Sequence, residues 1–299
     1  MLALALGSSA APTKRQASGD VTDADILQYA LTLEHLENAF YKKALSMFPL
    51  EAFTAQGFSA DFYNDLKYIA HDEQGHVEFL EAGLTAAGAS PVAACTYDFP
   101  FTDPKSFVAL ASVIEGVGVS AYLGAAADIT SKSYLTDAGA ILVTEALHQS
   151  TERAANGEVA EANVFGTPLG LNAVYTIAAQ FITSCPSSNQ ALLVKAYPSL
   201  TLKSGAPTSP GANVDLVLEN LPSGTYYATF VSGLNITSVH IQPIQNGMIM
   251  AEVPENASGQ SYVFLTSDNS GNITDSSVIA GPAIIEVTPS SPTLDTSEV

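Results

Sequence analysis

The sequence predicts an α+β multidomain protein, in which a four-helix bundle is followed by a small antiparallel β-sandwich. Long segments with apolar residues near a 3.6-residue period fill the first part of the 299-residue chain. After Pro198 the chain becomes rich in Val, Ile, Thr and Tyr, with turn residues at intervals of about ten residues. A chain of this length is sufficient for two domains of ordinary size.

Helix signals delimit the elements of the bundle. Four helices are expected over residues 22–48, 59–87, 104–130 and 134–155, and a shorter fifth over 168–183. Thr22 is a suitable N-cap with Asp25 three residues later, and Pro104 suits a first helical turn. The 15-residue segment 89–103 could span about 50 Å, which exceeds the roughly 38 Å of a 25-residue helix. A crossover connection along the bundle is therefore possible.

The domain boundaries follow from these elements. We expect a signal or pro segment at 1–20, the bundle at 21–185, a linker at 186–205, the sandwich at 206–289 and a disordered tail at 290–299. Alternating apolar runs predict strands at 214–218, 226–231, 239–243, 248–253, 262–266 and 283–288.

Charge and hydropathy exclude two classes of partner. The chain has 30 acidic and 10 basic residues and a formal net charge of −20, so no basic surface is available for nucleic acid. No apolar run reaches about 18 residues without a charge or a break, so no membrane span is expected.

Several features predict export. The apolar run Met1–Leu6 is followed by small residues and by a dibasic Lys14-Arg15 pair, as in a cleaved secretory leader. Three N-glycosylation sequons begin at Asn235, Asn256 and Asn272. We therefore expect a secreted glycoprotein, extracellular or in the cell wall.

The two cysteines, Cys95 and Cys185, each follow a predicted helical hairpin. An even count in a secreted chain favours one disulfide, and the alternative is a pair of buried free thiols.

Two Glu-x-x-His motifs supply candidate metal ligands. Glu73 and His76 form one, and Glu145 and His148 form the other. Positions i and i+3 share a helix face, so each motif presents a carboxylate beside an imidazole. The preceding helices offer Glu34 and Glu115, and the complete set is the ligand pattern of a di-metal carboxylate site in a bundle.

Carboxylate and imidazole ligands suit Fe(II) and Mn(II), between which the sequence does not choose. Glu73 and Glu145 are expected to bridge two ions, with Glu34 and Glu115 as terminal ligands. His76 and His148 would each bind one ion. Glu115 is the only charge in an apolar run, and a lone acid there is rarely buried unless paired.

Two tyrosines lie at matching distances after the glutamates of the first and third predicted helices. Tyr41 lies seven residues after Glu34, and Tyr122 lies seven residues after Glu115, which places each tyrosine on the face of its glutamate. Both are candidate catalytic residues that could supply an electron. Glu37 competes with Glu34 for the role in the first helix, and the Tyr41 spacing favours Glu34.

These segments resemble the ferritin-like domain family of secreted fungal stress-response and sexual-development proteins, which is related to bacterial desiccation-associated proteins. The resemblance covers residues 20–200 and rests on four segments, 33–41, 71–76, 114–118 and 144–148. It implies a ferritin-like four-helix bundle, and it says little about activity because this branch of the family has few assigned activities.

Two functional hypotheses follow. In the first, a secreted di-metal protein oxidises or scavenges metal, or consumes peroxide, with O2 or H2O2 as co-reactant in a stress response. In the second, a structural or cell-surface glycoprotein has a non-catalytic bundle, and its sandwich binds a polymer or a surface partner. A metal assay separates the two. The sequence predicts no oligomeric state.

Overall fold

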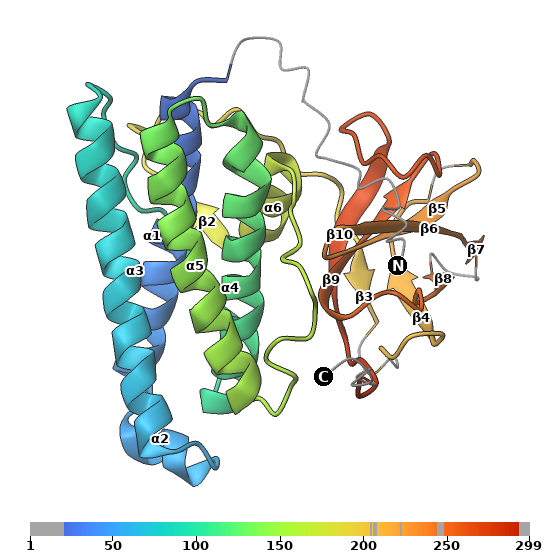
Figure 1. Ribbon diagram of the computed structural model, residues 1–299, viewed down its shortest axis with the longest axis horizontal. Coiled ribbons are helices and arrows are strands. Elements are labelled where there is room, and N and C mark those ends of the chain that lie inside the picture. Colours follow the sequence, from blue (N-terminus) through green and yellow to red (C-terminus); the bar gives the residue numbers. More distant parts are fainter. Residues whose placement is uncertain (1–20, 204, 206–207, 222, 244–247, 293–299) are drawn as a thin grey trace, which may run out of the picture.

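A computed structural model describes residues 21–292 except 204, 206–207, 222 and 244–247, so the predicted leader and most of the predicted tail lie outside the described residues. The predicted fold class is confirmed, because a helical bundle is followed by antiparallel sheets (Figure 1). The long helices are α1 (Asp23–Met47), α3 (Ala60–Ala86), α4 (Pro104–Ala125) and α5 (Lys132–Ala155).

The helices begin where the capping signals indicated. Thr22 and Asp25 form a capping box at α1, and Asp103 caps α4 with Pro104 in its first turn. Helix α4 is shorter than predicted, because the chain tightens into a 3-10 turn (η1) at Ala126–Asp128.

Two connections contain elements that the sequence analysis did not predict. A short helix α2 (Leu50–Ala55) follows Pro49. The predicted helix 168–183 is observed only as α6 (Leu171–Ala178), because Ile182–Ser184 forms strand β2 and pairs with β1 (Thr96–Tyr97).

The crossover segment between α3 and α4 is anchored at several points. The predicted disulfide between Cys95 and Cys185 is confirmed, and it lies beside the β1–β2 pair. From α1, the Gln28 side chain donates to the Ser90 carbonyl and accepts from the Val92 amide. These contacts fix a long loop that would otherwise leave backbone groups unpaired.

The β region contains two four-stranded sheets. One has the order β10-β9-β5-β6 and the other β3-β4-β8-β7. The strands are β3 (Thr201–Leu202), β4 (Asn213–Val217), β5 (Tyr227–Ser232), β6 (Asn235–His240), β7 (Gln242–Pro243), β8 (Met248–Glu252), β9 (Gly259–Thr266) and β10 (Val278–Val287).

Some strand positions differ from the sequence predictions. Strand β3 lies inside the range predicted as linker and pairs with β4, so the second sheet begins there. Strand β6 starts at Asn235 rather than at residue 239, because Gly233, with φ of 55°, allows a tight turn after β5.

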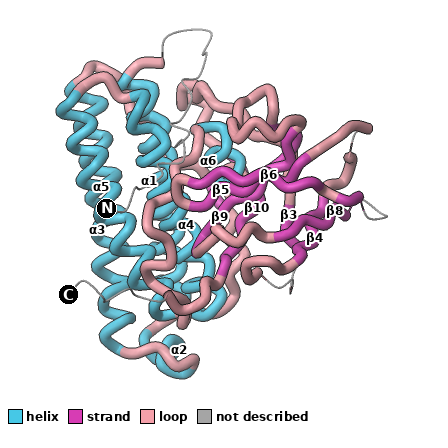
Figure 2. The backbone as a smooth tube through the Cα atoms, turned by 45° about the vertical axis from the view of Figure 1, so that its right-hand side comes forward, coloured by secondary structure: helices cyan, strands magenta, loops and turns pink. Residues whose placement is uncertain are grey.

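The first sheet lies between the bundle and the second sheet (Figure 2). On β9, Tyr262 and Phe264 pack into the bundle core, whereas Val263 and Leu265 pack between the sheets. Burial on both faces explains why this strand is continuously apolar. The Tyr262 hydroxyl donates to the Gly116 carbonyl of α4 over 3.0 Å, which fixes the sandwich against the helix that carries Glu115.

One described helical stretch, Pro104–Asp128, is long and apolar enough to cross a membrane by length and composition. Glu115 interrupts its sequence, and 72% of its most apolar window is buried inside the protein. This degree of burial is what the core helix of a bundle shows.

Candidate metal centre

The four long helices bring all six predicted ligands together at mid-bundle. Helix α1 contributes Glu34, α3 contributes Glu73 and His76, α4 contributes Glu115, and α5 contributes Glu145 and His148. The four glutamates are fully buried, and His148 is 4% exposed. Each side chain arrives from a regular helix, so the backbone rather than a loop sets its position.

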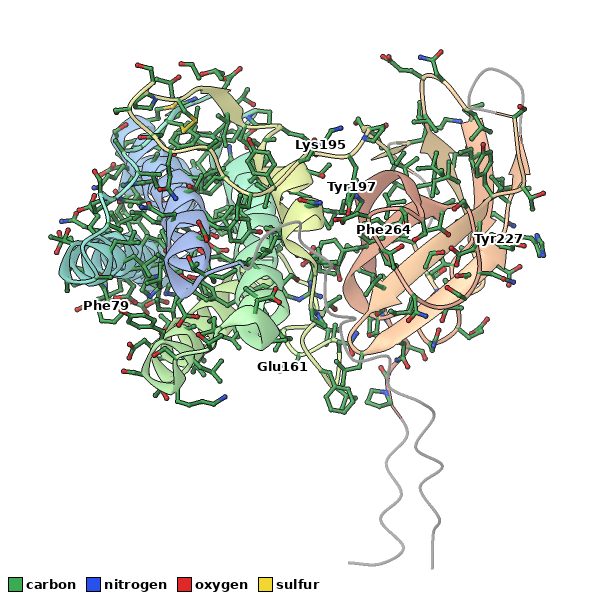
Figure 3. The ribbon with its side chains drawn as sticks, turned by 90° about the horizontal axis from the view of Figure 1, so that it is seen from above. Phe79, Glu161, Lys195, Tyr197, Tyr227 and Phe264 are labelled. Atoms are coloured by element: carbon green, nitrogen blue, oxygen red, sulfur yellow. A yellow bond between two sulfur atoms is a disulfide. The ribbon has the colours of Figure 1, made fainter. Side chains whose placement is uncertain are left out.

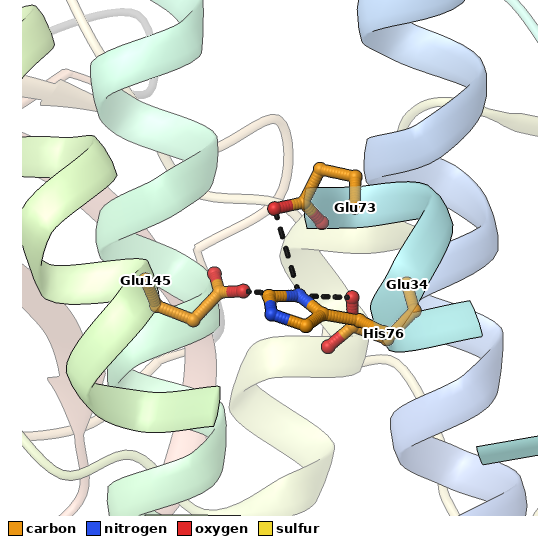
Figure 4. A group of neighbouring side chains, drawn as sticks. All are labelled: Glu34, Glu73, His76 and Glu145. Atoms are coloured by element: carbon orange, nitrogen blue, oxygen red, sulfur yellow. Dashed lines mark ion pairs between the residues drawn. The ribbon is translucent and has the colours of Figure 1, made fainter. Parts of the chain in front are cut away.

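His76 lies at the centre of the first group of ligands (Figure 4). Its Nδ1 atom is 3.2 Å from Glu34 Oε2, 3.3 Å from Glu145 Oε1 and 3.6 Å from Glu73 Oε1. These four residues come from three helices, and each offers a ligand atom within 4.8 Å of the others. This spacing is suitable for one cation.

His148 belongs to a second group of the same kind. Its Nδ1 atom is 3.1 Å from Glu73 Oε1 and 3.2 Å from Glu115 Oε2. Glu145 completes this group, so Glu73 and Glu145 are common to both. Two ligand groups that share two carboxylates have the arrangement of a site for two ions, in which the shared carboxylates bridge.

Several carboxylate oxygens at the centre lack a well-directed hydrogen bond. Both oxygens of Glu73, both oxygens of Glu145 and Oε2 of Glu34 are buried without a well-directed hydrogen bond, although a histidine Nδ1 lies 3.1–3.6 Å from three of them. Burying carboxylates in this way is very costly unless a counter-charge is present. The donor set is hard oxygen with imidazole nitrogen, which divalent Fe or Mn accepts. The residues present therefore fit a pair of such ions.

Without metal, the centre retains protons. Burial and the charge of Glu115 raise the pKa of Glu73 to about 7. Burial and Glu73 raise the pKa of Glu145 well above its ordinary value. Burial alone would lower the pKa of His148, but the carboxylates of Glu115 and Glu73 outweigh it and raise that pKa to about 11. Cations and protons therefore compete for the same atoms.

Binding of Mn(II) should release protons, and its affinity should rise with pH. The raised pKa values mean that the free centre is protonated at neutral pH, so about two protons or more leave when the ions bind. The affinity should increase as pH rises through about 7, where Glu73 titrates. Calorimetry of Mn(II) binding between pH 6 and 8, in buffers of different ionisation enthalpy, measures both quantities. Binding without proton release would contradict this assignment.

The two tyrosines pair across the bundle. Each was expected on the same helix face as the glutamate of its own helix. In the structure, Tyr122 of α4 donates to Glu34 of α1, and Tyr41 of α1 donates to Glu115 of α4. The helices pack with these faces opposed, so each hydroxyl reaches the neighbouring carboxylate. Burial, followed by the adjacent carboxylates, raises the pKa of both phenols well above 10.

Glu152 is a buried residue at the centre that the sequence analysis missed. It is fully buried on α5, and its Oε1 lies 2.6 Å from the Tyr41 hydroxyl oxygen. Burial and Glu115 raise the pKa of Glu152. Tyr41 has one hydroxyl hydrogen, so a protonated Glu152 can donate to Tyr41 while Tyr41 donates to Glu115. The available signal was spacing, because Glu152 lies two turns after Glu145.

Two further acids lie beside the predicted set. Asp72 Oδ2 is 3.3 Å from His148 Nε2 and can orient that ring. Glu37, the competitor of Glu34, is 3% exposed, and burial followed by the charge of Glu145 raises its pKa. Glu34 belongs to a group of mutually close ligand atoms among the described residues, whereas Glu37 belongs to none.

Comparisons with known proteins show what the helical part of the chain is similar to. The model of the ferritin-like domain family matches residues 22–158. Protein rds1 of Schizosaccharomyces pombe (strain 972 / ATCC 24843) is 25% identical over 252 residues, which are 83% of this chain, and the match spans 61% of the length of that protein.

A crystal structure of a conserved hypothetical protein from Mycobacterium tuberculosis gives a TM-score of 0.38 at 16% identity, covering 45% of this chain and 91% of that one. The bundle that carries the cluster of carboxylates and histidines, at residues 22–158, belongs to the ferritin-like domain family.

Proposed function

We propose that the bundle binds two divalent metal ions, Fe(II) or Mn(II), and acts as a di-metal oxidoreductase. The proposed ligands are Glu34, Glu73, His76, Glu115, Glu145 and His148. The observation that carries the proposal is the pair of ligand groups that share Glu73 and Glu145, whose carboxylate oxygens lack a well-directed hydrogen bond. Membership of the ferritin-like domain family supports it.

Two adjacent redox ions would supply the two electrons that O2 or H2O2 accepts, so we propose metal oxidation or peroxide consumption as the activity. Around them, Tyr41 and Tyr122 would hold the terminal carboxylates Glu115 and Glu34 in place. Glu152 would keep a proton next to Tyr41. The burial of these tyrosines and glutamates would exclude bulk water from their contacts.

We further propose that the protein acts outside the cell, in a stress response. The disulfide between Cys95 and Cys185 supports an oxidising compartment. The asparagines of the three sequons, Asn235, Asn256 and Asn272, are all exposed and therefore accessible to glycosylation.

The test is Fe(II) oxidation by O2, together with H2O2 decomposition, by protein of measured metal content. We expect about two ions per chain and rates above those of free metal at equal concentration. His76→Ala and His148→Ala should remove the excess rate, because each ion would lose its nitrogen ligand.

Tyr41→Phe and Tyr122→Phe should retain the metal but slow turnover by on the order of tenfold, because the terminal carboxylates would lose their donors. Tyr63→Phe is the matched control, because Tyr63 packs on Phe53 rather than on the carboxylates. Two bound ions without any excess rate would contradict the enzyme proposal and favour a metal-stabilised structural bundle. Failure to bind metal would contradict both.

A further inference from the structure

An apolar cavity of about 250 Å³ lies inside the bundle, between α1, α3, α4 and α5. Among its described lining residues, Asp137 is the only one with a charged side chain. Tyr29 also lines it, but the Tyr29 hydroxyl donates to the Leu171 carbonyl. Apolar cavities of about 150 Å³ in other proteins stay dry and bind benzene, so a cavity of this size and lining is suited to an apolar ligand.

The cavity begins next to the metal centre. Tyr122 lines it and donates its hydroxyl hydrogen to Glu34. Leu80 lies one turn beyond His76 on α3, and Ile141 lies one turn before Glu145 on α5. A molecule in the cavity would therefore lie one side chain away from the proposed ligands.

The cavity is elongated along the bundle axis. On α1 its lining extends from Leu33 to Ile26, two helical turns or about 10 Å. Two of its lining residues reach solvent: Phe79, which is 50% exposed on the side of the bundle that faces away from the sandwich (Figure 3), and the half-buried Asp137. An extended chain of about eight carbons has this length.

The carboxylate of Asp137 indicates which polar group a bound aliphatic chain would carry. Asp137 lies eight residues before Glu145 on α5, about 12 Å from it along the helix and away from the metal centre. Its carboxylate, in a chain of net charge −20, would repel the carboxylate of a fatty acid. The same carboxylate can accept a hydrogen bond from a hydroxyl. A neutral aliphatic alcohol is compatible with both the apolar wall and the carboxylate of Asp137.

We propose that this cavity binds an unbranched aliphatic chain with a neutral hydroxyl head, with the chain end directed at Tyr122 and the head at Asp137. This inference goes beyond the proposed function, because binding of the chain requires no metal.

The probe is 1-octanol, titrated by calorimetry into the full chain with and without Mn(II). We expect one octanol per chain in both states and weaker binding of octanoate. Gly83→Leu should weaken octanol binding by about tenfold or more, because Gly83 lines the cavity and a Cβ there meets no atom within 4 Å. Gly139→Leu is the matched control: its Cβ is equally free and Gly139 does not line the cavity.

The orientation of octanol in the cavity can be measured separately. In the Mn(II)-loaded protein, the paramagnetic ions should relax the terminal methyl protons of octanol faster than the protons beside its hydroxyl group. The reverse order would overturn the orientation. Equal octanol affinity in Gly83→Leu and the parent would overturn the site. Binding that appears only after removal of residues 1–20, or on dissociation of a dimer, would mean that the chain itself occupies the cavity, and would also overturn it. Metal content is measured separately, so a failure of the metal centre is distinguishable from a failure of the cavity.

Discussion

Replacing Glu145 by Gln should stabilise the metal-free protein and destabilise the metal-loaded one. Without metal, both Glu145 oxygens are buried without a well-directed hydrogen bond, and only Oε1 has His76 Nδ1 nearby, at 3.3 Å, so removing the ionisable group should raise the free energy of unfolding by about 1 kcal/mol or more. With metal, the variant loses a ligand that both groups share. Binding at a thousandfold excess over Kd stabilises a protein by about 4 kcal/mol, and much of that gain should disappear.

The stabilising effect should grow with pH. Burial and Glu73 raise the pKa of Glu145, so the metal-free folded state binds more protons than the unfolded state. Its stability therefore falls as pH rises above the ordinary range of a carboxyl group, and Glu145→Gln removes that loss. Thermal unfolding at pH 5 and pH 8, with a chelator or with Mn(II), measures all four combinations.

Glu37→Gln is the matched control for this experiment. Glu37 is also buried and its pKa is also raised, so the substitution should stabilise the metal-free protein in the same direction. Because Glu37 belongs to neither ligand group, the variant should still bind two ions. If Glu145→Gln retained full stabilisation by Mn(II) while Glu37→Gln lost it, the assignment of the shared carboxylate would be reversed.

Local signals were sufficient to predict the helical part of the fold. Thr22, Asp103 and Pro104 delimit helices through capping contacts within four residues, so the sequence contains them directly. Strand β3 and the β1–β2 pair were missed because each is only two or three residues long. Such short strands are set by partners far away in the chain, which no local pattern reveals.

The same distinction applies to the centre. Spacing on single helices led to the six proposed ligands, because i and i+3 positions share a face. The crossed pairs of Tyr41 with Glu115 and of Tyr122 with Glu34 depend on how α1 and α4 pack together. That packing is a tertiary property, so the sequence could place each tyrosine on the helix face of its own glutamate but could not identify the carboxylate that its hydroxyl reaches.

Gly118→Ala should remove metal from a bundle that still folds. Gly118 is in the middle of α4, where glycine costs about 1 kcal/mol relative to alanine, so its presence needs a reason. A Cβ there would lie 2.2 Å from Glu145 Oε2 and 2.9 Å from Glu37 Oε1. Both atoms end flexible side chains, so the helix can remain while the carboxylate of Glu145 is displaced from both ligand groups.

We therefore expect Gly118→Ala to bind fewer than about half of the parent's ions, by elemental analysis, with an unchanged far-ultraviolet circular dichroism spectrum. Gly139→Ala is the control, because a Cβ there meets no atom within 4 Å and the helix should gain stability without losing metal. If Gly118→Ala kept two ions, close approach to Glu145 would not explain the glycine. If both variants lost metal, a general effect of alanine on the helices would be responsible. Loss in Gly118→Ala alone would mean that the bare backbone of α4 at residue 118 is part of the centre, since it leaves the space that the shared carboxylate occupies.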